Sequence, residues 1–158
     1  MAWLTAMGVA FGAPKNIVFF IVDDMSSDTG AYGNPVIKTP HLDALAEDGT
    51  LFSQAFATTA SCSASRSVVL TGLHNHANGQ YGHQHAFHGF ESWLKVRGLP
   101  ILLEECGYRT AQIGKLHVAP QEVYRFQEYL KGDPRQTVGM AENCEDFISS
   151  EDDRPFFL

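Results

Sequence analysis

The pattern of apolar and polar positions along the chain predicts strands that alternate with helices. An uninterrupted apolar run over residues 17–22 is typical of a strand buried on both faces of a parallel sheet. Further strands are expected at residues 51–58 and in the first half of residues 109–118, which end in a turn. This order of elements predicts an α/β fold with a mainly parallel central sheet and flanking helices.

Three helices are expected between these strands, each with a recognisable start or stop. Thr39 is in the position of an N-cap, Pro40 begins the first helix, and Gly49 ends it. The second helix follows Ser61 in the segment "SCSASRSVVLTG". In the third, over residues 99–106, the 3.6-residue period places one set of residues on a core-facing side: Leu99, Leu102, Leu103 and Cys106.

The two ends of the chain carry separate expectations. Residues 1–14 are mostly apolar and lack a basic start, which is compatible with the remnant of a signal peptide and is too short for a membrane span. We therefore divide the chain into residues 1–14 and a domain over residues 15–158, and expect an exported protein. Residues 152–158 form a polar turn and then three apolar residues, so the last strand, and with it the fold, is expected to be incomplete at the C-terminus.

Composition and charge narrow the classes of partner. The 158 residues are 44% hydrophobic, which suits one globular domain. A net charge of −7 makes nucleic acid an unexpected partner, and an anionic substrate would need a local cation or a bound metal ion. The three cysteines have no CxxC or CxxH spacing, which argues against a disulfide framework and a zinc finger.

Adjacent carboxylates follow the first predicted strand. Asp23 and Asp24 cannot comfortably share a small space unless a cation lies between them, and ligands that are all oxygen suggest calcium or magnesium. The alternative is an exposed acidic turn.

Two short segments carry candidate catalytic groups. Cys62 begins a helix, where backbone N–H groups favour a thiolate or an oxyanion, and Arg66 adds a positive charge one turn later. The alternative for Cys62 is an ordinary buried cysteine. In "GKLH", Lys115 and His117 are two residues apart after a strand, so both side chains could point into one crevice, or lie in a solvated turn.

Histidines are concentrated between the second and third predicted helices. A transition-metal site is one interpretation, but glycine and asparagine interrupt the run and no pair has HExxH spacing. A glycine-rich loop whose histidines contact substrate fits as well. The five histidines are His74, His76, His83, His85 and His88.

Taken in order, "VDDM", "CSASRSVVLTG" and "GKLH" resemble the sulfatase family of the alkaline-phosphatase superfamily. The segments "NGQYG" and "FESWLKVRGLPILLEECGYRTAQIGKLHV" look most like the glucosamine N-sulfohydrolases, which act on heparan-type sugars. The resemblance implies an alkaline-phosphatase-like fold, of which residues 15–158 would be the N-terminal portion of the catalytic domain. At position 64 this chain has Ala, where the commonest form of the family motif has Pro.

The resemblance also implies a role for each candidate residue. Cys62 would be oxidised to formylglycine by a maturation enzyme, and the hydrated aldehyde would supply the nucleophilic oxygen. Asp23, Asp24 and the group at position 62 would hold Ca²⁺. Arg66 would steady the hydrated aldehyde and Lys115 would contact the sulfate. His117 would hydrogen-bond the diol, and His76 is expected to contact substrate.

The expected function is therefore hydrolysis of a sulfuric ester or sulfamate, on N-sulfoglucosamine of heparan-type sugars. These 158 residues are expected to be inactive on their own. The expected location is the bacterial periplasm or the extracellular space, or the lysosome in a eukaryote. The sequence does not decide whether the protein forms a homodimer. One alternative is a phosphodiesterase or phosphonate hydrolase of the same superfamily. Another is a non-catalytic fragment that acts as a binding module.

Overall fold

The computed structural model describes residues 12–85 and 87–158, which form parts of two compact units. The first unit contains the described residues up to Phe19 together with residues 100–115 and 126–158. The second contains residues 20–99 and 116–125. The segment expected to be a signal-peptide remnant, residues 1–14, lies almost wholly outside the described residues. No helix in the described ranges is long and apolar enough to cross a membrane.

The first unit is built on a parallel sheet, as the sequence predicted. Its strand order is β2-β1-β3, with β1 at Arg109–Gln112, β2 at Glu128–Tyr129 and β3 at Phe156–Phe157. Both pairings are parallel, with Ala111 opposite Glu128 and Arg109 opposite Phe156. The expected α/β class and the final apolar strand are therefore confirmed.

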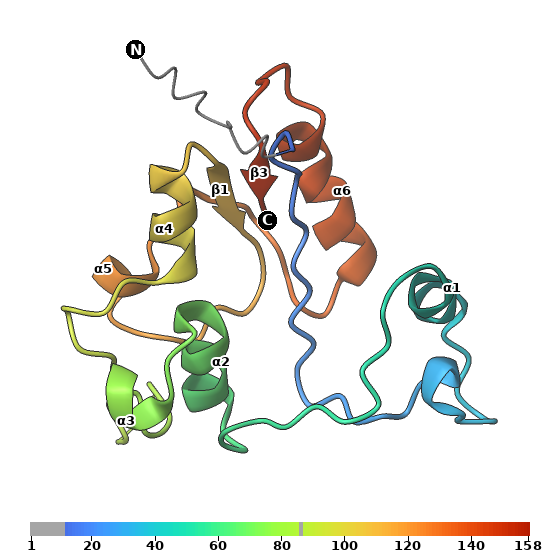
Figure 1. Ribbon diagram of the computed structural model, residues 1–158, viewed down its shortest axis with the longest axis horizontal. Helices are drawn as coiled ribbons and strands as arrows, with labels where there is room; N and C mark the ends of the chain where they lie inside the picture. The colour runs from blue at the N-terminus through green and yellow to red at the C-terminus, as the bar shows by residue number, and fades with distance from the viewer. Residues whose placement is uncertain (1–11, 86) are drawn as a thin grey trace, which may run out of the picture. The chain divides into compact units, whose positions relative to one another are not determined.

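One long helix packs on this sheet. In α6, Thr137–Ile148, Phe147 is buried against Ala111 of β1 and Phe156 of β3, and Figure 1 shows α6 next to β3. The guanidinium of buried Arg109 lies 4.6 Å from the centre of the Phe147 ring, and its Nη2 donates to the Phe147 carbonyl. Arg109 Nε also lies 3.6 Å from a carboxylate oxygen of Asp152. This charged side chain is therefore held by aromatic and anionic neighbours.

The apolar run at residues 17–22 forms less of a strand than the sequence predicted. Ile17 makes a parallel bridge to Phe157, and its N–H donates to Phe156 O at 2.7 Å. The Phe20 side chain, however, is 81% exposed and Val22 is also exposed. The expectation of burial on both faces is wrong, because the backbone bonds of this run end at Phe19, and no packed neighbour in the described part of the chain covers the side chains of Phe20 and Val22 beyond it.

The strand expected at residues 51–58 is also wrong. These residues form no regular element, and Phe52 and Phe56 are exposed. An apolar run becomes a strand only when a neighbouring strand satisfies its backbone groups, and the described residues supply no such neighbour here.

The second unit contains most of the remaining helices. They are η1 (Gly30–Tyr32), α1 (Pro40–Asp48), α2 (Cys62–Thr71), α3 (Asn75–Asn78) and α5 (Gln121–Tyr124). A buried cluster forms its core: Leu70, Val96, Val118, Val123 and Tyr124, with Leu116 packed against them. This cluster joins α2, α5 and the connecting segments.

Helix α1 begins and ends where the sequence predicted, but Thr39 does not act as a side-chain cap. Its Oγ1 instead accepts from Gly30 N at 2.9 Å and donates to Asp43 Oδ1 at 2.9 Å. Asp43 also accepts from Ala31 N at 2.7 Å. These bonds tie η1 to α1.

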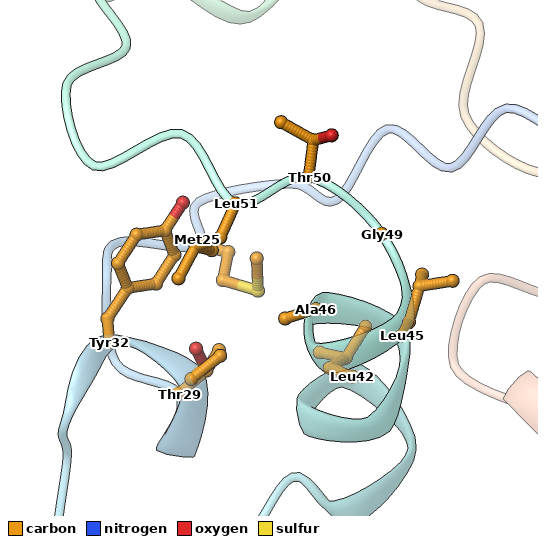
Figure 2. A pocket seen from close by; sticks show the side chains of 10 residues that line it. Met25, Thr29, Tyr32, Leu42, Leu45, Ala46, Gly49, Thr50 and Leu51 are labelled. Atoms are coloured by element: carbon orange, nitrogen blue, oxygen red, sulfur yellow. The ribbon is translucent and has the colours of Figure 1, made fainter.

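A cavity of about 330 Å³ lies beside α1. Figure 2 shows the side chains that line it: Met25, Thr29, Ala31, Tyr32, Leu42, Leu45, Ala46, Gly49, Thr50 and Leu51. None of these residues is charged, so the lining offers no cation or carboxylate for an anion or a metal ion. The candidate chemistry lies elsewhere.

Helix α4, Leu99–Glu105, is shorter than predicted. Cys106 follows the helix, and Gly107 adopts a left-handed φ of 89°. The expectation that Cys106 faces the core is wrong, since it is exposed. Leu102, which was expected on the same side and lies within the helix, is also exposed, and the buried residue of α4 is Pro100. The core-facing side predicted for residues 99–106 is therefore wrong.

Candidate active site

Helix α2 places Cys62 at its first residue, as predicted. Ser61 is extended (φ −129°, ψ 132°), and the Ser65 N–H donates to the Ser61 carbonyl at 2.8 Å. The N–H groups of the first turn therefore lack acceptors within the helix and favour negative charge beside Cys62. Helix α2 ends at Gly72, whose φ of 66° is costly for other residues.

A polar network below α2 holds the turn that carries Cys62. Ser67 Oγ donates to the Ala64 carbonyl at 2.8 Å, and Asn75 Nδ2 donates to the same carbonyl at 2.9 Å. Asn78 Nδ2 donates to Ser67 Oγ at 3.0 Å. Ser67 and Asn78 are fully buried. The first turn of α2 is thus fixed from two directions.

The same hydrogen-bond network holds the loop that follows α3 in place. Gln80, also fully buried, donates through its backbone N–H to Asn78 Oδ1 at 2.8 Å and through Nε2 to Phe90 O at 2.6 Å. The Gln84 N–H donates to Ser63 Oγ at 3.1 Å. Sequence reasoning assigned no individual role to Asn75, Asn78 or Gln80. Asn75 and Asn78 find their partners on α2, at Ala64 and Ser67, so no pattern within their own segment could show these bonds.

The two aspartates and Cys62 come together, as expected for a metal site. Ligand atoms of Asp23, Asp24 and Cys62 all lie within 4.8 Å of one another. Arg66, whose side chain is 7% exposed, approaches Asp23 with 3.2 Å between Nη2 and Oδ1. Asp24 has a left-handed φ of 52°, an uncommon conformation for a non-glycine residue. Arg66 thereby brings positive charge next to the carboxylate pair.

This donor set fits a calcium ion. Calcium binds oxygen at about 2.3–2.6 Å, so two ligands of one ion are at most about 5 Å apart, and donor atoms that lie within 4.8 Å of one another meet this limit. Two of the three donors are carboxylates, which calcium prefers. The third donor is the Cys62 sulfur, which is not an oxygen ligand.

His117 lies in a group of histidines next to this helix. Its Nε2 is 2.5 Å from His85 Nδ1, and the two rings are stacked with centroids 4.7 Å apart. His83 Nδ1 lies 3.4 Å from the hydroxyl of Ser61, the residue before Cys62. The structure thus links His117 to the start of α2 through His83 and His85, two of the five histidines that the sequence analysis considered for a metal site or a substrate-contacting loop.

The remaining predicted site residues are placed less directly. His76 is exposed in α3, with its ring stacked on His74 at 5.7 Å. Lys115 is half-buried and belongs to the first unit, whereas His117 belongs to the second. A shared crevice for Lys115 and His117 therefore stays a prediction, as does substrate contact by His76.

Comparison with known proteins identifies relatives of this chain. A family model described as Sulfatase matches residues 15–158. The chain is 42% identical to N-sulphoglucosamine sulphohydrolase of Homo sapiens, over 99% of the chain and 33% of that protein. It is 35% identical to the ulvan-active sulfatase of Formosa agariphila, over 82% of the chain and 25% of that protein. The chain thus spans about a quarter to a third of these relatives.

Solved structures agree with this assignment of the fold. One is a protein in complex with its substrate D-glucosamine-2-N,6-O-disulfate, with a TM-score of 0.71, 27% identity, and coverage of 90% of this chain and 33% of that one. Another, in complex with k-i-k-neocarrahexaose, has a TM-score of 0.74 at 22% identity and covers 91% of this chain and 44% of that one. At that identity the likeness concerns the fold alone.

Proposed function

Because the chain belongs to the sulfatase family, we propose that residues 15–158 are the N-terminal portion of a catalytic domain that hydrolyses sulfuric esters or sulfamates. The observation that carries this proposal is the meeting of Cys62, Asp23 and Asp24 at the start of α2, with Arg66 beside them. The remaining two thirds of such a domain would supply further ligands and the acid for the leaving group. We expect no turnover from these residues alone.

The proposed substrate is N-sulfoglucosamine of heparan-type sugars. The relative that is 42% identical to the chain is named for sulfohydrolysis of N-sulphoglucosamine. A structural neighbour at 27% identity holds a glucosamine with a 2-N-sulfate. Both names point to the same kind of sugar.

Cys62 is proposed to act after oxidation to formylglycine. The hydrated aldehyde would supply a nucleophilic oxygen for sulfur and could release sulfate by returning to the carbonyl, which a thiol cannot do. The N–H groups of the first turn of α2, which lack acceptors within the helix, and the cation of Arg66 favour negative charge at that position. Cys62 is half-buried, so a sulfate group can reach it from solvent.

Each neighbouring side chain has a proposed task. Asp23 and Asp24 would hold Ca²⁺, which would neutralise charge on a sulfate oxygen and offset the repulsion of an anion by a chain of net charge −7. His117 would donate or accept a hydrogen bond at the diol, in an orientation that His85 helps to hold. Lys115 would contact the sulfate, and His76 would contact the sugar.

The wider biology follows from the same proposal. A maturation enzyme must act on Cys62 with Ala64 in the recognised segment. We propose an exported protein, in the bacterial periplasm or outside the cell, or in the lysosome of a eukaryote.

Peptide mass spectrometry across residues 61–66 of the protein from its native source tests the central step. The expected result is a mass at position 62 in which the thiol has been replaced by an aldehyde or its hydrate. An intact thiol in all molecules would contradict the proposal and favour a non-catalytic binding module.

Paired assays on the full-length protein test the class of substrate. We expect release of sulfate from N-sulfoglucosamine and aryl sulfates. Much faster cleavage of aryl phosphonates or phosphodiesters would instead show a phosphorus hydrolase of the same superfamily.

A further inference from the structure

Three imidazoles converge next to α2 from two distant parts of the chain. His83 and His85 come from the loop after α3, and His117 comes from the segment before α5. One ring nitrogen from each lies within 4.8 Å of the others. Ring centroids are 4.9 Å apart for His83 and His85 and 4.7 Å apart for His85 and His117.

This spacing is close to what a tetrahedral transition-metal ion requires. Zinc binds imidazole nitrogen at about 2.0–2.1 Å, so the nitrogens around one ion are about 3.3 Å apart. One pair, His85 Nδ1 and His117 Nε2, is 2.5 Å apart and would open by about 0.8 Å around an ion. His85 is exposed, so this adjustment needs no rearrangement of the core.

The chemistry of the donors selects the class of metal. Imidazole nitrogens suit Zn²⁺, Cu²⁺ and Ni²⁺, whereas Ca²⁺ takes oxygen ligands. The hydroxyl of Ser61 lies 3.4 Å from His83 Nδ1 and can hold that ring, as outer partners of metal-binding histidines do. Three imidazoles with a fourth position open are a known zinc arrangement.

We propose that His83, His85 and His117 form a binding site for Zn²⁺ or a similar transition-metal ion, separate from the oxygen site at Asp23 and Asp24. An ion bound there engages His117 and withdraws it from the diol, so Zn²⁺ inhibits hydrolysis. The inhibition rests on the function proposed above, whereas the binding does not.

Metal binding is measured on the full-length protein with Cys62→Ser, which removes the sulfur from the neighbouring aspartates. Zn²⁺ is titrated in competition with a chromophoric chelator, and Co²⁺ binding is followed by its visible absorption. We expect one equivalent of Zn²⁺ to be lost, or its affinity to fall at least about tenfold, in His85→Ala and in His83→Ala. The matched control is His41→Ala, an exposed histidine of α1, which should bind Zn²⁺ as the parent does.

Equal Zn²⁺ affinity and equal Co²⁺ spectra for His85→Ala and His41→Ala would overturn the site and leave the histidines as a hydrogen-bonded stack. In the enzyme that carries formylglycine, Zn²⁺ should lower the rate of hydrolysis by the parent protein. It should not lower the rate of His85→Ala, whether or not that variant is slower than the parent without zinc. Zinc bound through His85 with no effect on rate would overturn the inhibitory step. A protein without sulfatase activity would overturn the proposed function, while the titration would still decide the metal site.

Discussion

Replacing Asn78 by alanine tests whether the buried amide network, rather than apolar packing, holds the helix that carries Cys62. Asn78 Nδ2 donates to Ser67 Oγ at 3.0 Å and to Leu73 O at 3.1 Å, and its Oδ1 accepts from Gln80 N at 2.8 Å. Alanine would remove these three bonds, and a longer one from Nδ2 to Thr71 Oγ1 at 3.4 Å, from a fully buried position.

The magnitude follows from the groups left behind. The buried Gln80 N–H loses its acceptor, at a cost of about 1–3 kcal/mol for an unsatisfied buried group. The Leu73 carbonyl is less buried, so its loss costs about 1 kcal/mol. We expect Asn78→Ala to lower the free energy of unfolding by about 2–4 kcal/mol. Asn78→Asp should cost at least as much, since a carboxylate oxygen would then face the Leu73 carbonyl.

Equilibrium urea unfolding of the full-length protein measures the loss as a shift in midpoint at constant slope. Asn143→Ala is the matched control, because this exposed amide makes one comparable bond, to Lys131 O at 2.9 Å. Its loss should be below about 1 kcal/mol. If Asn78→Ala proved no more destabilising than Asn143→Ala, the reasoning about the buried network would be refuted.

Three further predictions concern the site and the acid range. Cys62→Ala should abolish turnover with little change in the urea midpoint, because its task is chemical, and appreciable residual sulfate release would argue against it. Asp24→Asn should raise the Ca²⁺ concentration needed for half-maximal activity, and an unchanged calcium dependence would contradict the metal role. Hydrogen bonds from Arg154 lower the pKa of Asp152 from 3.8 to about 2. The stabilisation from ionised Asp152 is therefore complete above the pKa of the unfolded chain and is lost as pH falls toward 2. We expect the urea midpoints of wild type and Asp152→Asn to differ near neutrality and to converge in acid. A difference that stays constant with pH would refute this prediction.

Several local elements followed from the sequence because their determinants are neighbours in the chain. Pro40 and Gly49 bracket α1, and Cys62 and Gly72 bracket α2, as predicted. The strand β1 and the turn at Gly114, with φ 80°, also came out as expected. Backbone sterics and helix-end hydrogen bonding act within a few residues, so such signals can be read without knowing the fold.

The same signals failed where a distant partner decides the outcome. Residues 17–22 and 51–58 have apolar runs typical of strands, yet a strand forms only where another strand satisfies its backbone. The helical period predicted that Leu102 and Cys106 face the core, yet both are exposed. Burial is a property of the assembled neighbours, and an apolar run alone does not supply them.

The candidate residues themselves were visible in the sequence, because adjacent carboxylates and a cysteine at a helix start are local patterns. Which of these residues contact one another was not visible in the sequence. Arg66 and Asp23 are separated by 43 positions in the chain, and His85 and His117 by 32. Such contacts depend on the path of the whole intervening chain. The sequence by itself therefore determined which chemical groups were available and on which elements, and the tertiary structure alone decided which of them lie within bonding distance.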